Sequence, residues 1–321
     1  MVHFRTLREE EIDKWLDFLV NDIFIGEPRS YFSNQWVCDP QRDIEGIFVA
    51  VDEEDNFLST IRVFPRELYI AGERIFAGGI GSVGTKESHR GQGLSTTIFT
   101  MCQKYMVSKG MKVSWLLCGE HNESFYQRFG YNKSPFVRKI SDTDAGATKY
   151  KAPLLLRDAV FPYDIPALSL MYENFSGKHN GPTVRDKEYW TWWVSSFGGG
   201  KYKIATDNEG SPIAYINFDL DESTIFIFDF GYMEGYSDVF DSFITCLSTA
   251  YENTPLKVVY QSTIFSKMPV MDQLEMCLIM YKLILPFQTC NLSIADSDAL
   301  LHVLHGDSQE SKLLLWEVDD V

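Results

Sequence analysis

The chain repeats one order of secondary-structure signals, and this repetition limits its possible folds more than any other feature. Leu156-Arg157 followed by Asp164-Ile165 echoes Phe4-Arg5 followed by Glu11-Ile12, about 150 residues earlier. In both places, apolar residues then recur at helical spacing. A chain of 321 residues also exceeds what one ordinary hydrophobic core fills. Two similar α/β units in tandem are therefore expected.

Alternating and helical hydrophobic patterns predict the elements of the first unit. A turn at 52–56 should join two strands as a hairpin, and glycines at 91 and 93 precede a long helical pattern. The expected helices are 12–19, 94–108 and 122–129, and the expected strands are 4–6, 46–51, 57–70, 74–85, 112–117 and 136–140.

The second unit shows the same signals in the same order. A hairpin turn is expected at 207–210, followed by a strand at 224–230, a helix at 238–251 and a strand at 256–261. Residues 141–148 are small and polar and include a glycine, so we expect a linker there. The expected domains are residues 1–145, which carry the chemical motifs, and residues 151–321.

Composition and charge exclude several classes of protein. A formal charge of −16 opposes binding to nucleic acid or anionic lipid and favours a cationic small substrate, although acidity also serves solubility. The start of the chain lacks a signal peptide's apolar core, and no apolar run is long enough to span a membrane. The six cysteines are widely spaced, without a metal-site pattern. We expect a cytoplasmic protein with reduced cysteines and no metal.

Glycines are densest at the end of the predicted strand 74–85. Gly79, Gly81 and Gly84 spell G-x-G-x-x-G, but a dinucleotide site needs a helix to begin at the third glycine and an acidic residue about 20 positions later. Residues 85–89 are typical of a loop, and position 104 is Lys. A nicotinamide site is therefore disfavoured, and we expect these glycines to let a ligand approach the strand backbone.

A second glycine-containing segment is a better candidate for binding phosphate. Arg90-Gly91-Gln92-Gly93-Leu94-Ser95 lies between a predicted strand and a predicted helix. Backbone N–H groups at a helix N-terminus suit a pyrophosphate when no side chains obstruct them. A glycine pair before a helix is also typical of an ordinary turn, so the hexad alone leaves both interpretations open.

Four segments in a fixed order resemble the GCN5-related N-acetyltransferase (GNAT) superfamily. They are Gly81–Thr85, the hexad Arg90–Ser95, Trp115–Leu117 and the box Phe125-Tyr126-Gln127-Arg128-Phe129-Gly130-Tyr131. The resemblance implies two units of the α/β (α+β) class, each with a mixed, mostly antiparallel sheet flanked by helices. It also implies acetyl-CoA as cosubstrate and a primary amine on a small-molecule or peptidic cationic acceptor. The implied coenzyme-binding residues are Val83, Gly84, Thr85, Arg90, Gly91, Gln92, Gly93, Leu94, Ser95, Asn122 and Ser124.

The tandem arrangement is similar to the Eis-like acetyltransferases, whose second unit is degenerate. Here Tyr232-Met233-Glu234-Gly235-Tyr236 stands where a second hexad would be, so we expect one coenzyme site per chain. The resemblance also implies a possible homo-oligomer. Two departures from the pattern stand out. Ser95 replaces the usual final Gly or Ala, and after residue 285 too few residues remain for the relatives' sterol-carrier-like domain of about 100 residues.

The resemblance assigns roles to individual residues. Tyr126 aligns with the general acid that protonates the departing sulfur, and the backbone N–H of Val83 would face the thioester oxygen. For the base, His121, the terminal carboxylate of Val321 and a water chain all stay open. Aromatic residues offer an acceptor pocket or ordinary core, namely Tyr31, Phe32, Trp36, Trp190, Trp192 and Trp193.

Two other functions use the same features. A non-catalytic acyl-CoA-binding or regulatory protein would keep the phosphate-binding segment without turnover. An aminoacyl-tRNA-dependent transferase also uses tandem units of this type, but it needs a basic groove, and the acidity of the chain disfavours it.

Overall fold

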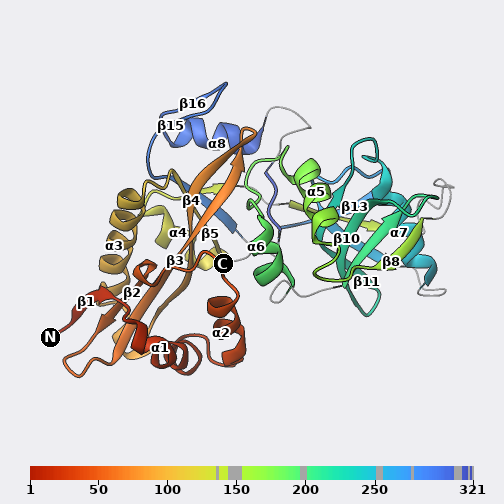
Figure 1. Ribbon diagram of the computed structural model, residues 1–321. Helices are drawn as coiled ribbons and strands as arrows, with labels where there is room; N and C mark the ends of the chain where they lie inside the picture. Colours follow the sequence, from red (N-terminus) through yellow and green to blue (C-terminus); the bar gives the residue numbers. More distant parts are fainter. Residues whose placement is uncertain are drawn as a thin grey trace.

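The computed structural model describes residues 1–134, 137–143, 154–195, 201–250, 256–275, 278–306, 313–316 and 319. It contains two mixed, seven-stranded sheets, each flanked by helices, and the two units lie side by side along the long axis of the molecule (Figure 1). The α+β class and the tandem arrangement expected from the repeated pattern are confirmed.

The first sheet holds the N-terminal strands in chain order. Its order is β1 (His3–Thr6), β2 (Ile47–Val51), β3 (Phe57–Ile70), β4 (Glu73–Thr85), β5 (Val113–Cys118), β14 (Leu278–Leu283) and β6 (Asn132–Ser134). Neighbours are antiparallel except β4 and β5, which the helix α3 (Leu94–Lys109) connects as a parallel pair.

Helices cover both faces of the first sheet. Buried residues at four-residue spacing, Leu94, Ile98 and Cys102, direct α3 onto one face, where α4 (Glu123–Gln127) also packs. The opposite face is covered by α1 (Ile12–Phe18), α2 (Arg29–Val37), α8 (Ser297–His305) and the small hairpin β15 (Phe287–Gln288) and β16 (Ser293–Ile294).

The second sheet repeats this topology. Its order is β8 (Leu155–Asp158), β9 (Lys201–Thr206), β10 (Pro212–Asp221), β11 (Thr224–Tyr232), β12 (Lys257–Gln261), β7 (Val137–Asp142) and β13 (Val270–Glu275). Here β11 and β12 form the parallel pair, and α7 (Val239–Ala250) connects them as α3 connects β4 and β5. The helices α5 (Ile165–Ser176) and α6 (Lys187–Tyr189) lie between β8 and β9 in the chain.

Each sheet contains one strand from the other half of the chain, because β14 belongs to the first sheet and β7 to the second. The strand β6 pairs antiparallel with β14 in the first sheet, with Ser134 opposite Ile279, and β7 pairs antiparallel with β13 in the second sheet, with Val137 opposite Glu275. The strand expected at 136–140 as the last of the first unit is therefore wrong in its placement, because β14 occupies that position in the first sheet. Ser141 and Asp142 belong to β7 and not to the expected linker.

This exchange means that the sheets do not divide the chain at one point. The boundary between residues 145 and 151 marks where the sequence pattern restarts, and as a domain boundary it stays a prediction. The remainder of the expected linker, residues 144–148, lies outside the described residues.

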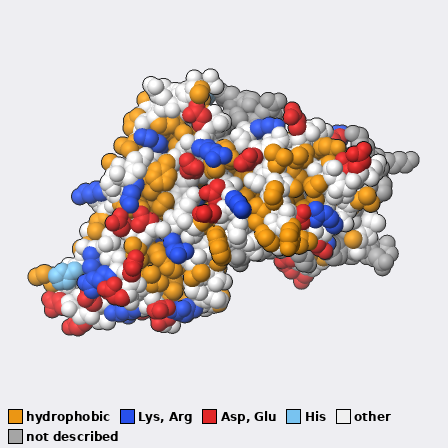
Figure 2. All heavy atoms as spheres, viewed as in Figure 1, with side chains coloured by type: hydrophobic (Ala, Val, Ile, Leu, Met, Phe, Trp, Pro, Cys, Tyr) orange, Lys and Arg blue, Asp and Glu red, His pale blue; other side chains and the backbone are white. Residues whose placement is uncertain are grey.

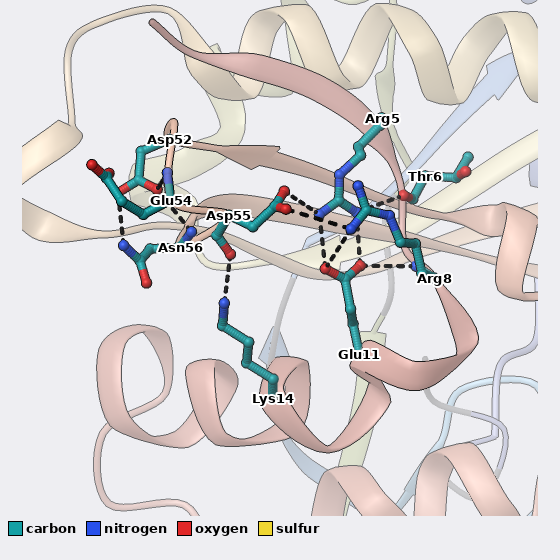
Figure 3. A network of polar contacts seen from close by, with 9 residues as sticks. All are labelled: Arg5, Thr6, Arg8, Glu11, Lys14, Asp52, Glu54, Asp55 and Asn56. Atoms are coloured by element: carbon teal, nitrogen blue, oxygen red, sulfur yellow. Dashed lines mark hydrogen bonds and ion pairs between the residues drawn. The ribbon is translucent and has the colours of Figure 1, made fainter.

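Equivalent ion pairs occur in the two units, so the repeat extends to side chains. Arg5 donates to both carboxylate oxygens of Glu11 at 2.7 and 2.8 Å and also to Asp55 (Figure 3). In the second unit, Arg157 binds both oxygens of Asp164 at 2.7 Å. Each pair ties the first strand of its unit to the start of the following helical segment. The echo in the sequence therefore reflects equivalent positions.

Candidate active site

The strands β4 and β5 separate part-way along their length. They pair only at Ala77–Val113, Gly78–Ser114 and Gly79–Trp115, although β4 continues to Thr85 and β5 to Cys118. Where they separate, β4 carries an extra residue against β3, because the register shifts between Thr60 and Arg62. Bulges of this kind re-aim the backbone and are common beside active sites.

The bulge contains a strained residue. Ser82 has φ of 49°, a left-handed conformation that costs free energy for a residue other than glycine. Its hydroxyl is buried and has no hydrogen-bond partner among the residues that the structure describes. Such strain is characteristic of functional sites, where the surrounding fold holds the backbone in place.

A cleft of about 490 Å³ opens between the separated strands. Ile80–Val83 of β4 form one wall, and Leu117, Cys118 and Gly119 at the end of β5 form the other. Because the strands part here, elements from both faces of the sheet reach the cleft. They contribute Tyr126 and Asn122 from the α4 side, and Phe24, Glu27, Tyr31, Phe32 and Gln35 from the α2 side.

Tyr126 lines this cleft and lies near the end of α4. Its ring packs edge-on against Phe99, Phe125 and Tyr131. Its hydroxyl makes no hydrogen bond to any residue in the described part of the chain. Burial, with a smaller effect from Cys118, raises the pKa of Tyr126 above its usual value. The side chain is therefore held as a neutral phenol that can donate a proton.

The loop before α3 leaves its backbone open. Gly91 and Gly93 have φ of 77° and 76°, which glycine adopts without strain, and nothing lies within 4 Å of the position that a Cβ would take at either residue. Gly93 caps α3 without any side-chain hydrogen bond. The first amides of a 16-residue helix thus face an unobstructed surface, which favours an anion.

A chain of hydroxyls joins this helix to the cleft. Ser95 Oγ lies 2.7 Å from Thr85 Oγ1, which lies 2.8 Å from Ser59 Oγ, and Ser59 donates to the carbonyl of Gly84. The helix N-terminus is therefore fastened to the end of β4, whose preceding residues line the cleft.

Comparison with known proteins agrees with this geometry. Residues 3–134 match the model of the acetyltransferase (GNAT) domain. The chain carries a GNAT acetyltransferase domain. The matched segment contains the separated strands, the glycine loop, α3 and Tyr126. This domain is thus of the GNAT N-acetyltransferase type, and the family implies an acyl-CoA cosubstrate. No curated protein matches the sequence significantly.

Solved structures share the tandem GNAT-like fold over most of the chain. One is a conserved protein of unknown function from Enterococcus faecalis, described as a probable N-acyltransferase, at 16% identity and a TM-score of 0.71 over 90% of this chain and 76% of that one. A GCN5-related N-acetyltransferase from Anabaena variabilis has 17% identity and a TM-score of 0.68 over 88% and 73%. Eis1 from Mycobacterium abscessus has 13% identity and a TM-score of 0.60 over 88% and 74%. At these identities the likeness shows the fold.

Two glycines of the GNAT domain are required by protein neighbours, whereas the approach of a ligand to the glycine-dense strand stays a prediction. A Cβ at Gly84 would lie 2.1 Å from Ile23 Cγ2, and one at Gly78 would lie 2.7 Å from the sulfur of Met106. Protein side chains occupy the space at these two positions. Gly81, in contrast, lines the cleft.

The GNAT domain brings only some of the candidate site residues together. Val83, Asn122 and Tyr126 line the cleft, whereas His121 is exposed beside Gly119 and does not line it. Arg90 and Gln92 are exposed on the loop, where Arg90 Nε donates to the carbonyl of Thr85. Leu94 is buried and Ser124 is exposed, and Val321 lies outside the described residues.

The aromatic candidates divide between pocket and core. Tyr31 and Phe32 line the cleft, whereas Trp36 does not. Trp190 and Trp193 are fully buried in the core of the second unit, and Trp192 is 56% exposed.

Sequence analysis missed α2, although it carries much of the cleft wall. Pro28 at the N-cap and the spacing of Tyr31, Phe32, Gln35 and Trp36 could have indicated a helix. The weak contrast between its faces hides this signal.

Charged side chains of both signs lie on the described surface. On the face shown in Figure 2, acidic and basic side chains are interspersed over both units without a single basic patch. Within the described ranges, no helix has the length and apolar character that crossing a membrane requires. The same residues contain no group of His, Cys, Asp or Glu suited to a metal ion.

Proposed function

We propose that this chain transfers an acetyl group from acetyl-CoA to a primary amine of a small or peptidic cationic acceptor. The observation that carries the proposal is that the Ser95–Thr85 hydrogen bond connects the N-terminus of α3 to the strand β4, which lines the cleft. An uncapped helix N-terminus suited to a pyrophosphate lies beside a cleft that separates two parallel strands and holds Tyr126.

In the proposed binding mode, the amides at the start of α3 and the open backbone of Gly91 and Gly93 hold the coenzyme diphosphate. Arg90 adds a positive charge that is always present. The remaining coenzyme atoms run along β4 into the cleft, where the bulge at Ser82 turns the backbone N–H of Val83 toward the thioester oxygen.

In the proposed reaction, the neutral amine attacks the thioester carbonyl carbon, the new C–N bond forms and the C–S bond breaks. The Tyr126 hydroxyl gives its proton to the departing sulfur. The raised pKa of Tyr126 suits this role, because the phenol stays protonated at neutral pH. The amine loses its extra proton to solvent; a water chain is the base we propose, since His121 does not line the cleft.

The acceptor side of the cleft favours a cation. Glu27 is the charged residue among the described residues that line it, and Tyr31 and Phe32 lie beside it. A carboxylate with aromatic faces attracts an ammonium group through charge and cation–π interaction. We place the reaction in the cytoplasm, a reducing compartment that suits the free thiols of Cys38, Cys102, Cys118, Cys246 and Cys290.

The test measures product formation from acetyl-CoA with a panel of primary amines. The release of free coenzyme A reports the reaction. The proposal predicts an N-acetylated product with cationic amines. A non-catalytic acyl-CoA-binding protein would instead show thermal stabilisation by coenzyme A and no consumption of acetyl-CoA with any amine.

A further inference from the structure

The amide of Gln35 opens onto the cleft and has no hydrogen-bond partner among the described residues. Gln35 lies on α2 and is 4% exposed. Its side chain makes no hydrogen bond to any residue in the described part of the chain, and the residue lines the cleft that also holds Tyr126. The amide atoms of Gln35 are not fully buried, so they reach the solvent of the cleft and are free to bond a ligand.

A ligand that fills the cleft displaces the water around this amide. Leaving the amide without a partner then weakens binding, unless the ligand supplies a hydrogen bond. The other residues of this wall are Phe24, Glu27, Tyr31 and Phe32, and in the described part of the chain no hydrogen bond joins any of them to the Gln35 side chain. A ligand group in the cleft would satisfy the amide.

A second unpaired polar group lies in the same cleft. The hydroxyl of Ser82, at the bulge of β4, is buried without a partner in the described ranges of the chain. Gln35 and Ser82 come from different elements, α2 and β4, and both line the space between the separated strands. Two polar side chains without partners among the described residues thus line one cleft, and they favour a bound molecule that carries hydrogen-bonding groups of its own.

We propose that Gln35 determines acceptor specificity by hydrogen bonding a hydroxyl or amide group that the acceptor carries close to its reacting amine. This inference rests on the proposed function and narrows the acceptor to cationic amines with such a neighbouring polar group. Plain alkyl amines leave the Gln35 amide unpaired and bind more weakly for that reason. A site built around a hydrogen bond rejects analogues that lack the matching group.

The experiment compares matched acceptors that differ in one polar group: 1,3-diamino-2-propanol against 1,3-diaminopropane, and glycinamide against propylamine. The value of kcat/KM is measured for wild type and Gln35→Leu with each acceptor. The variant-to-wild-type ratio for each acceptor cancels differences in amine pKa. Gln35→Leu should lower kcat/KM about 10-fold for the polar member of at least one pair and less than about 2-fold for its apolar partner.

The control is Asn34→Leu, which removes an exposed amide from the same helix without touching the cleft and should leave all four ratios unchanged. Gln35→Met keeps an unbranched side chain and serves as a second variant if Gln35→Leu is unstable in a thermal melt. Equal ratios within both pairs, with wild type active on them, would overturn the role of Gln35 and leave the proposed function intact. If wild type acetylates none of the four amines or any other amine, both proposals are wrong.

Discussion

Thr85 and Ser95 connect the end of β4 to the first turn of α3 through a hydroxyl–hydroxyl hydrogen bond of 2.7 Å. Ser95 stands where related hexads end in Gly or Ala, and its hydroxyl is engaged with protein. The amide of Ser95, not its hydroxyl, is then the group available to a phosphate.

Removing that hydroxyl should affect stability more than coenzyme binding. Ser95→Ala should lower the free energy of unfolding by about 1 kcal/mol, the usual value of one neutral hydrogen bond. The KM for acetyl-CoA should change less than about 2-fold.

Gly93→Ala is the contrasting variant, because φ of 76° strains any residue with a Cβ and shifts the first amides of α3. It should raise the KM by about 10-fold. Denaturant unfolding and steady-state kinetics measure both effects, and a larger KM change in Ser95→Ala than in Gly93→Ala would refute this division.

Gly84 should respond to its protein neighbour and not to a ligand. A Cβ there would lie 2.1 Å from Ile23 Cγ2, so Gly84→Ala should destabilise the fold by about 1–3 kcal/mol. Adding Ile23→Ala should recover part of this loss, because the second substitution removes the clashing atoms. A double-mutant cycle of unfolding free energies measures the coupling. Additive effects would show that the space at Gly84 is not taken by Ile23.

The buried guanidinium of Arg185 should be among the most sensitive positions of the second unit. It binds Asp319 through two nitrogens at 2.9 and 3.0 Å and also donates to Asp229, and all three side chains are fully buried. Arg185→Met leaves two carboxylates without their cation and should cost about 3–5 kcal/mol. Arg29→Met, which breaks exposed ion pairs with Asp13 and Asp17, is the matched control and should cost less than about 1 kcal/mol. Similar costs in chemical denaturation would argue against a tightly coupled buried cluster.

The pH dependence of kcat follows from the state of Tyr126. Burial raises the pKa of this phenol, so the protonated form that acts as an acid persists below a higher pH than for an exposed tyrosine. Loss of the acid therefore occurs only as pH rises through that elevated pKa. Between about pH 7 and about pH 10, kcat should rise or stay level as the acceptor amine deprotonates. A fall with a midpoint below about pH 9 would assign the acid to another group.

Local patterns predicted the elements that carry the glycine loop, because the turn from β4 to α3 and β5 depends on residues adjacent in the chain. They could not place β14 beside β5, since pairing between Leu278 and Cys118 joins distant parts of the chain and leaves no periodic signal. The same limit applies to the cleft. The motif indicated Tyr126, whereas the unpaired state of Gln35 depends on what surrounds it in space.

The role of Tyr126 is tested most directly by the kcat of Tyr126→Phe with saturating acetyl-CoA and amine. The substitution removes one hydroxyl that has no hydrogen-bond partner among the described residues, so it should leave folding and the KM for acetyl-CoA nearly unchanged. Tyr131→Phe is the control, because that hydroxyl lies 2.6 Å from Ser114 Oγ and its loss should affect stability first. We predict that kcat falls about 100-fold in Tyr126→Phe. A kcat equal to that of wild type would contradict acetyl transfer with Tyr126 as the proton donor.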